Sequence, residues 1–571
     1  MAKNDVSICA TRFGLFASAK HIGVVLVLGA SMAGASALTA VNDTAVTLPN
    51  TPVTLTILAN DSVSPTNSTG ILRVTQPAHG RVVINSVSGR HAELTPLFQF
   101  GARQLSNTVR QVVITNMYPF YVDNGVWYTL PTNSPSCPDC NWVGGFFPGS
   151  LWLIYEYTGD TNYSKWAQQW QAALAPEQNS TDADDVSFII NTSFGNGYRI
   201  TGNPAYKSIL VQTCRSFTNR WNHIVGCFAD DLILTPPPFE TVIDTMVNTE
   251  IYYRQDLGLS TNMLFKAISH AGRVLTNDVR ADGSTFQRVV YDCITNGSVL
   301  YQDNRVSIGP CDTWARGHSW ATHAFPYLYQ NDGDPRFLQT AERIANFYMS
   351  IAPADYVPYW YYPSNGVTTG LLRDSSAAAV TLSGLINLSQ VVTNDADGAK
   401  YWQAAHNLFA SLSSTNYLAV NTTNAILLHG YPVDVDLDTP LVYGDYYFLE
   451  SLKRYNDVFN QTTLTYTPAT NYTGTDTFTY QACDSSGAVS TATVTVTVGI
   501  VAQMSLSPFT DWPVISFPTS TGADYFVQYQ NSPGSAASWQ ILATNLSGSG
   551  SIISVADTNP PVTRFYRVGS P

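Results

Sequence analysis

A short turn pattern recurs through the middle of the chain and constrains its fold more than any other feature. Three copies read Thr158-Gly159-Asp160, Thr201-Gly202-Asn203-Pro204 and Asp332-Gly333-Asp334-Pro335, and a weaker fourth is Asp397-Gly398. Glycine suits the residue after a helix, Asp or Asn suits the residue that begins the next helix, and proline suits its first turn. Repetition of such helix–turn–helix units across residues 97–457 predicts a closed helical toroid.

The segments on either side of this helical region have the alternation of β-strands. Residues 41–96 hold too few strands for a closed sandwich, and residues 458–500 supply further ones, at Leu464–Pro468, Tyr472–Tyr480 and Thr491–Val498. Two incomplete sandwiches would expose strand edges, whereas one sandwich with a domain inserted at a loop tip would not. We therefore predict a single β-sandwich that is split by the helical domain.

The two ends of the chain carry separate signals. Within residues 1–37, positive charges precede an apolar run at Ile22–Ala30 and then small residues spaced as Ala-x-Ala, which is typical of an export signal. The run is short for a membrane span, although an uncleaved anchor remains an alternative. Residues 501–571 return to strand patterns, which predicts a second β module. We therefore expect an exported protein.

Charge limits the partners that the chain can bind. The net charge is −13, and only 12% of the residues are charged. A nucleic-acid partner requires a basic face, so none is expected. An acidic ligand is not attracted at long range and must be bound by local groups such as Arg316.

The cysteine and histidine spacings predict neither a metal nor another cofactor. Of eight cysteines, Cys137 and Cys140 form a CxxC that reads as a bridge in a loop, and no second CxxC follows to complete a zinc site. Cys214 with Cys227 and Cys293 with Cys311 are expected to form local disulfides. The run Asp434-Val-Asp436-Leu-Asp438 allows a calcium loop, but a solvated acidic loop is the favoured interpretation.

The stretch from Trp314 to Trp320 concentrates the groups that bind an acidic sugar. It reads Trp314-Ala-Arg316-Gly-His318-Ser-Trp320. A guanidinium pairs with a carboxylate through two hydrogen bonds, and indoles stack on sugar rings. The alternative is a helix start with two core tryptophans.

Several motifs accompany this stretch in a fixed order: Asn141-Trp142, Asp184-Asp185, Glu240 to Asn248 with Asp244 inside it, Arg373-Asp374 and Tyr443-Gly444-Asp445. Together they resemble glycoside hydrolase family 88, the unsaturated glucuronyl hydrolases. The resemblance implies an (α/α)6 barrel for residues 97–457. The split sandwich resembles bacterial Ig-like, cadherin-like repeats, and residues 501–571 look like the fibronectin-III-like modules of exported bacterial enzymes. For that module the resemblance implies a spacer or an association with the cell surface, in preference to binding of a polysaccharide.

The resemblance also implies a reaction. Polysaccharide lyases leave a C4=C5 double bond on the non-reducing uronic acid of an oligosaccharide, and enzymes of this family add water across it. By motif match, Asp244 is the acid/base group that protonates C4 and activates water, and Asp185 is the second essential carboxylate. Trp142, Trp314 and Trp320 match aromatic positions of the sugar site, Arg316 a charged substrate contact, and His318 stands where the family usually has glutamine.

Other departures alter the pocket and keep alternatives open. Asp184 stands where the family often has histidine, and Arg305-Val306 replaces a His-Gln pair. A related unsaturated rhamnogalacturonyl hydrolase acting on pectin fragments is one alternative. An inverting glycosidase, with carboxylates about 6.5–9.5 Å apart, is another. The third is a non-catalytic surface-binding protein that uses its β modules.

Overall fold

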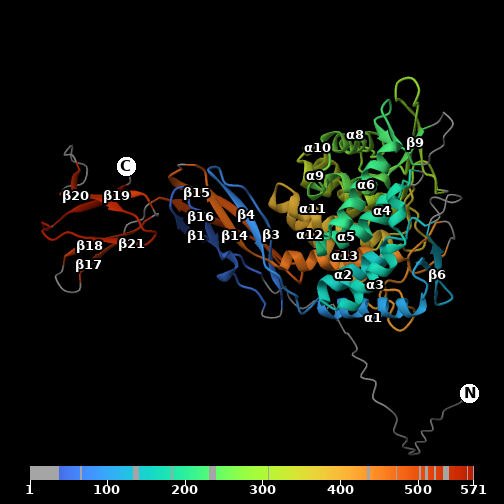
Figure 1. The fold of residues 1–571 in the computed structure, drawn as a ribbon, viewed down its shortest axis with the longest axis horizontal. Coiled ribbons are helices and arrows are strands. Elements are labelled where there is room, and N and C mark those ends of the chain that lie inside the picture. The colour runs from blue at the N-terminus through green and yellow to red at the C-terminus, as the bar shows by residue number, and fades with distance from the viewer. Residues whose placement is uncertain are drawn as a thin grey trace, which may run out of the picture. The chain divides into compact units, whose positions relative to one another are not determined.

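A computed structural model describes most of the chain (Figure 1). The described residues are 38–64, 67–132, 141–181, 184–230, 239–306, 308–433, 437–470, 472–499, 503–507, 512–519, 522–531, 539–561 and 563–569. The expected export signal at 1–37, the Cys137–Cys140 bridge and the acidic positions Asp434 and Asp436 lie outside them. None of the helices in the described part combines the length and apolar character needed to span a bilayer.

The middle of the chain forms a closed ring of helices. Each inner element contacts the next, from α2 through α13, α11, α9, α7 and α4 to the short η3 turn, which packs back on α2. Helix α11 is buried along its whole length from Ser375 to Ser389, as expected of a helix surrounded by protein on all sides. The bounds are α2 Phe146–Thr158, η3 Asn191–Gly195, α4 Val186–Ile190, α7 Thr245–Asn248, α9 Ala315–Asp332, α11 Ser375–Val391 and α13 Val442–Phe459.

A second layer of helices covers this ring. Helix α3 packs on α2, α10 on α9 and α12 on α11, so an inner helix is followed by an outer one. The outer helices bury one face only, which matches their amphipathic sequences. The arrangement is an α/α barrel, as the sequence predicts. The outer helices are α1 Thr95–Gln111, α3 Thr161–Ala172, α6 Pro204–Phe217, α8 Thr261–Asn277, α10 Pro335–Ile351 and α12 Asp395–Leu412.

Three of the four predicted turns join helices in the expected way. Gly159, Gly202 and Gly333 follow the ends of α2, α5 (Asn196–Thr201) and α9 with φ of 72°, 66° and 80°, which glycine adopts without strain. The next residue in each case caps the following helix with its side chain. The fourth prediction is wrong, because Gly398 lies inside α12, which Asn394 caps.

The barrel also carries short strands that the helical prediction missed. A hairpin joins β5 (Met117–Asp123) to β6 (Val126–Pro131), and a three-stranded sheet has the order β11–β10–β9. The strands of this sheet are β9 Phe239–Val242, β10 Arg288–Tyr291 and β11 Val299–Asp303. A two-residue strand, β12 (Thr313–Trp314), precedes α9 and pairs with β13 (Tyr361–Tyr362).

Strands from both sides of the barrel sequence share two β sheets. One sheet has the order β1–β16–β15–β3 and the other β2–β14–β4, so each combines early and late strands. Ile71, Tyr466 and Val494 are among the buried side chains between them. The strands are β1 Asp43–Thr47, β2 Val53–Leu55, β3 Thr69–Val74, β4 Gly80–Ser86, β14 Gln461–Pro468, β15 Gly474–Asp484 and β16 Val489–Val498.

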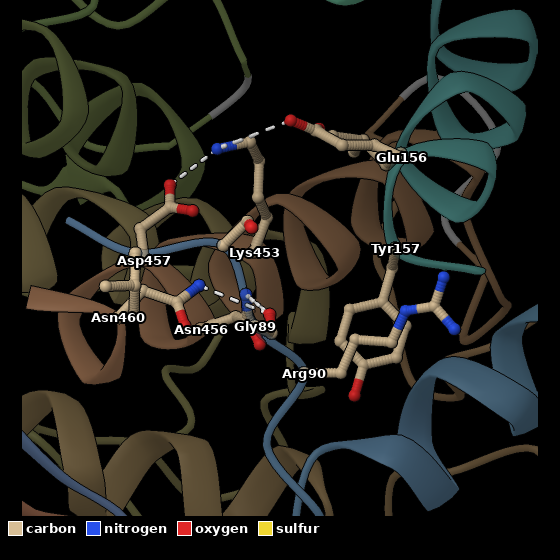
Figure 2. Close-up of a pocket in the computed structure, with 11 residues that line it drawn as sticks. Gly89, Arg90, Glu156, Tyr157, Lys453, Asn456, Asp457 and Asn460 are labelled. Atoms are coloured by element: carbon tan, nitrogen blue, oxygen red, sulfur yellow. Dashed lines mark hydrogen bonds and ion pairs between the residues drawn. The ribbon is translucent and has the colours of Figure 1, made fainter. Parts of the chain in front are cut away.

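The connection from β4 to α1 is tied to α13 (Figure 2). The amides of Asn456 and Asn460 donate to the Gly89 carbonyl at 3.0 and 3.3 Å. A polar cavity of about 480 Å³ lies beside this contact. Lys453, which lines it, pairs with Asp457 at 2.5 Å and approaches Glu156 at 3.9 Å. The asparagines therefore join the two ends of the barrel segment.

The C-terminal residues form two further sheets of three strands. Their orders are β17–β18–β21 and β20–β19–β22. Ile515, Phe517, Tyr525 and Val527 are buried between them. The strands are β17 Gln503–Leu506, β18 Pro513–Pro518, β19 Asp524–Gln530, β20 Gln540–Ser547, β21 Ile552–Ala556 and β22 Phe565–Gly569.

The two expected local disulfides are wrong. The cysteines within the described residues are all free thiols: Cys214, Cys227, Cys293, Cys311 and Cys483. Cys214 and Cys227 are buried in apolar surroundings, which raises the pKa of both thiols. Cys214 and Cys227 therefore contribute to the core as buried thiols and not as a disulfide.

Candidate active site

A cavity of about 640 Å³ opens where inner helices of the barrel begin. Asp185 is the residue before α4, Asp244 the residue before α7 and Trp314 the residue before α9. The sheet β9–β10–β11 adds side chains from one side. The lining residues are Trp142, Asp184, Asp185, Phe188, Asp230, Val242, Asp244, Gln287, Arg305, Val306, Trp314, Arg316 and Val433.

Asp244 lies in this cavity in a partly buried position. Its backbone is set by the end of β9, where the amide of Ile243 donates to the carbonyl of Gln287 at 2.9 Å. Burial raises the pKa of the Asp244 carboxyl to about 6, while the charges of Arg316 and Arg305 oppose the rise. Its Oδ1 makes no hydrogen bond to the described residues. A carboxyl with these properties can hold a proton near neutral pH and give it to a bound ligand.

Asp185 is joined to the Asp244 segment by Asn248. The Asn248 side-chain amide donates to Asp185 Oδ1 at 2.9 Å, and its oxygen accepts from the amide of Phe188, also at 2.9 Å. Asn248 is fully buried and follows Asp244 by one helical turn. The sequence placed Asn248 in a motif but gave it no role. The structure makes it the link that fixes α4 against α7.

Aromatic rings form part of the cavity wall. Trp142 lies 5.0 Å from the ring of Tyr443 and 5.9 Å from that of Phe188, measured between ring centroids. Trp314 lines the cavity from the start of α9. Rings at these positions offer flat surfaces on which a sugar ring can stack.

Arg316 reaches the cavity from the first turn of α9 but is held by the protein. It donates to Asp374 Oδ2 at 3.2 Å and to the Tyr431 carbonyl at 2.7 Å. Its guanidinium lies 4.7 Å from the ring centre of Trp314 and 5.1 Å from that of Tyr443. Asp374 also caps α11, so this ion pair ties α9 to α11.

The structure does not place His318 or Trp320 on the wall of this cavity, unlike the other three predicted substrate contacts. The exposed fraction is 0% for His318 and 1% for Trp320. Burial lowers the pKa of His318 to about 4, so the ring is neutral, and its Nε2 donates to the Ile344 carbonyl at 3.2 Å. Trp320 packs between Phe188 and Tyr447. Both residues belong to the core.

An ion pair that sequence reasoning missed crosses one side of the cavity. Arg305 follows β11 and pairs with Asp230, which follows β8 (Cys227–Phe228). The backbone beside Arg305 is fixed by Asn304, whose amide donates to the carbonyls of Gly309 and Asp312, each at 2.9 Å. Arg305 was noted only as a departure from a family pattern, and nothing around Asp230 in the sequence signals a site.

Comparisons with solved structures assign the fold. The crystal structure of an unsaturated glucuronyl hydrolase specific for heparin is 32% identical, with a TM-score of 0.58 over 63% of this chain and 96% of that one. The enzyme of Bacillus sp. GL1 matches with the same TM-score at 22% identity, covering 64% of this chain and 99% of the other. The fold and the acidic, aromatic cavity define a glycoside hydrolase built on an α/α barrel.

Comparisons with curated proteins assign the family. An unsaturated glucuronyl hydrolase of Formosa agariphila is 34% identical over 327 residues, which are 56% of this chain and 80% of that protein. An unsaturated chondroitin disaccharide hydrolase of Streptococcus pneumoniae is 25% identical over 62% of this chain and 92% of its own. The chain belongs to the unsaturated glucuronyl hydrolases. The family model for the bacterial Ig domain matches residues 404–497, which include β14, β15 and most of β16.

Proposed function

We propose that the protein adds water across the C4=C5 bond of unsaturated uronyl oligosaccharides and so releases the neighbouring sugar. The observation that carries this proposal is the Asp244 carboxyl, which combines a pKa of about 6 with an oxygen directed to no protein partner among the described residues. An acid with this pKa retains a proton at the pH where an ordinary aspartate has lost it.

The chemistry follows from the polarity of the substrate. The double bond is a vinyl ether, so a proton given by Asp244 to C4 leaves positive charge on C5 and the ring oxygen. Water then bonds to C5 and returns a proton to Asp244, which restores the acid. The resulting hemiketal opens, and the C1–O bond to the next sugar breaks as that sugar leaves with a proton. Atoms and charges balance without an external reagent.

The remaining cavity residues have supporting roles in this proposal. Asp185, fixed by Asn248, orients the water and stabilises the positive charge that develops at C5. Trp142 and Trp314 hold the sugar ring by stacking. Arg316 shapes the wall under Trp314 and keeps a positive charge close to the carboxylate of the substrate.

The test is the loss of ultraviolet absorbance of the vinyl ether. Lyase-generated disaccharides from chondroitin, hyaluronan, heparin, alginate and pectin are offered to the wild type and to Asp244→Asn. We expect absorbance loss on at least one glycosaminoglycan disaccharide with the wild type and none with the variant. Turnover on the pectin product alone would assign the rhamnogalacturonyl reaction instead.

Isotope labelling distinguishes hydration from direct displacement at the anomeric carbon. In H₂¹⁸O the label enters at C5 if water adds to the double bond, and at C1 if the glycosidic bond is displaced. In D₂O, hydration places deuterium at C4. Label at C1, or cleavage of saturated disaccharides, would overturn the proposed mechanism.

We also propose a setting and a domain plan for this activity. Residues 1–37 direct export of a bacterial protein to the periplasm, the cell surface or the medium. Residues 41–96 and 458–500 form one Ig-like sandwich around the catalytic domain at 97–457, and residues 501–571 form a fibronectin-III-like module. The shared sheets of β1–β4 and β14–β16 support the single sandwich. Association with a surface or polysaccharide through the β modules is tested by pull-down with chain truncated after residue 500.

A further inference from the structure

The two arginines of the cavity differ in how much of each side chain is exposed. Arg316 is 5% exposed, and its partner Asp374 is completely buried. The side chain of Arg305 is 40% exposed, while its partner Asp230 is 7% exposed. A guanidinium carries five N–H groups in a planar fork, so one that is held by a carboxylate on one side can still bind a second anion.

The charge around these arginines makes a local cation necessary. Four carboxylates line the cavity, those of Asp184, Asp185, Asp230 and Asp244, against two guanidinium groups. The net charge of the chain is −13. An anionic sugar therefore enters an acidic cavity of an acidic protein, and it requires a cation within hydrogen-bonding reach.

We propose that Arg305 is a specificity-determining residue that binds an anionic oxygen group of the substrate, either the carboxylate of the uronyl ring or a sulfate on the adjacent sugar. Asp230 holds the guanidinium at the cavity wall, and Asn304 fixes the backbone beside it. This inference rests on the proposed function. It adds a recognition group that the Trp314–Trp320 stretch does not contain.

Binding at Arg305 has a consequence for the acid. The positive charge of Arg305 opposes the rise in the pKa of Asp244. When a substrate anion neutralises this charge, the opposition weakens and Asp244 holds its proton more strongly. The anion that identifies the substrate thereby also keeps the general acid protonated in the complex.

The experiment compares kcat/KM for four full-length proteins on chondroitin disaccharides that carry no sulfate, a 4-sulfate or a 6-sulfate. The proteins are the wild type, Arg305→Gln, Arg305→Lys and the control Arg336→Gln, which removes an exposed arginine paired with Asp334. Thermal unfolding midpoints establish that each variant is folded. We expect Arg305→Gln to lower kcat/KM about 10- to 100-fold, the range for a hydrogen bond to a charged group. Arg305→Lys retains the positive charge but not the planar guanidinium, so its kcat/KM should lie between those of the wild type and Arg305→Gln.

The pattern of loss identifies the anion. An equal loss on all three disaccharides assigns the uronyl carboxylate, and a loss confined to sulfated disaccharides assigns the sulfate. In both cases the loss should appear mainly as a higher KM, whereas a purely structural role would lower kcat together with the folded fraction. Values within twofold of the wild type on every disaccharide, for both Arg305 variants, overturn the inference. A wild type inactive on every lyase product overturns the proposed function itself, and this inference with it.

Discussion

Replacing Asn248 by alanine tests whether the link between α4 and α7 positions Asp185 relative to Asp244. The change removes the hydrogen bond to Asp185 at 2.9 Å and leaves the amide of Phe188 without its acceptor. A hydrogen bond to a charged group contributes about 1.5–3 kcal/mol, and an orphaned buried donor costs about 1–3 kcal/mol. Because a tenfold change in rate corresponds to about 1.4 kcal/mol, loss of the Asp185 bond in the transition state lowers kcat/KM about 10- to 100-fold.

The assay is the loss of vinyl-ether absorbance, measured together with the thermal unfolding midpoint. Asn456→Ala is the matched control, since Asn456 is also buried and donates to a backbone carbonyl, that of Gly89, away from the cavity. Both variants should lose stability. Only in Asn248→Ala should kcat/KM fall by more than the decrease in the fraction of folded protein explains. Asn248→Asp places a second carboxylate beside Asp185 and should be at least as damaging. Equal activity in Asn248→Ala and Asn456→Ala would refute the reasoning.

The pH profile of activity, the stability of one helix contact and the reactivity of the thiols give three further tests. The pKa of Asp244, about 6, lies above the ordinary value for an aspartate, so the protonated acid persists up to about pH 6. Above pH 6, kcat/KM should therefore fall about tenfold per pH unit. A pH profile that is flat from pH 5 to 8 would contradict this. Gly384→Ala brings a Cβ to 2.4 Å from the Thr322 carbonyl between α11 and α9, so the unfolding midpoint should drop sharply, whereas Gly272→Ala, which has open space, should not. A thiol reagent should label Cys311 in the native protein and Cys214, Cys227 and Cys483 only after unfolding.

The sequence predicted the helical layers well because their signals are local. Gly159, Gly202 and Gly333 each end a helix in a backbone conformation that glycine favours, and the next residue caps the following helix. The prediction of a turn at Gly398 is wrong because α12 has already begun at Asp395, after its cap Asn394. The short sheet β9–β10–β11 was missed because four- and five-residue strands inside a helical pattern carry little periodicity.

The candidate site was predicted in part, for a geometric reason. Trp314 and Arg316 lie at the start of α9 and face the cavity. Each residue advances a helix by about 1.5 Å, so Trp320 lies roughly 6 Å deeper than Arg316, beneath Phe188 and Tyr447. His318 is turned away from Arg316 and reaches α10 instead. The spacing of residues in a motif does not show at which residue a helix becomes buried.

The pairing of early and late strands has a consequence for synthesis. Strands β1 to β4 are complete by Ser86, but β14, which joins β2 to β4, begins at Gln461. Chains are made at about 5–20 residues per second, so residues 87–460 take roughly 20–75 s. Throughout that time the first strands have open edges, which are templates for wrong partners. The two sheets therefore cannot be completed before residues 461–498 have been made, and their completion reports that the whole catalytic domain has been synthesised.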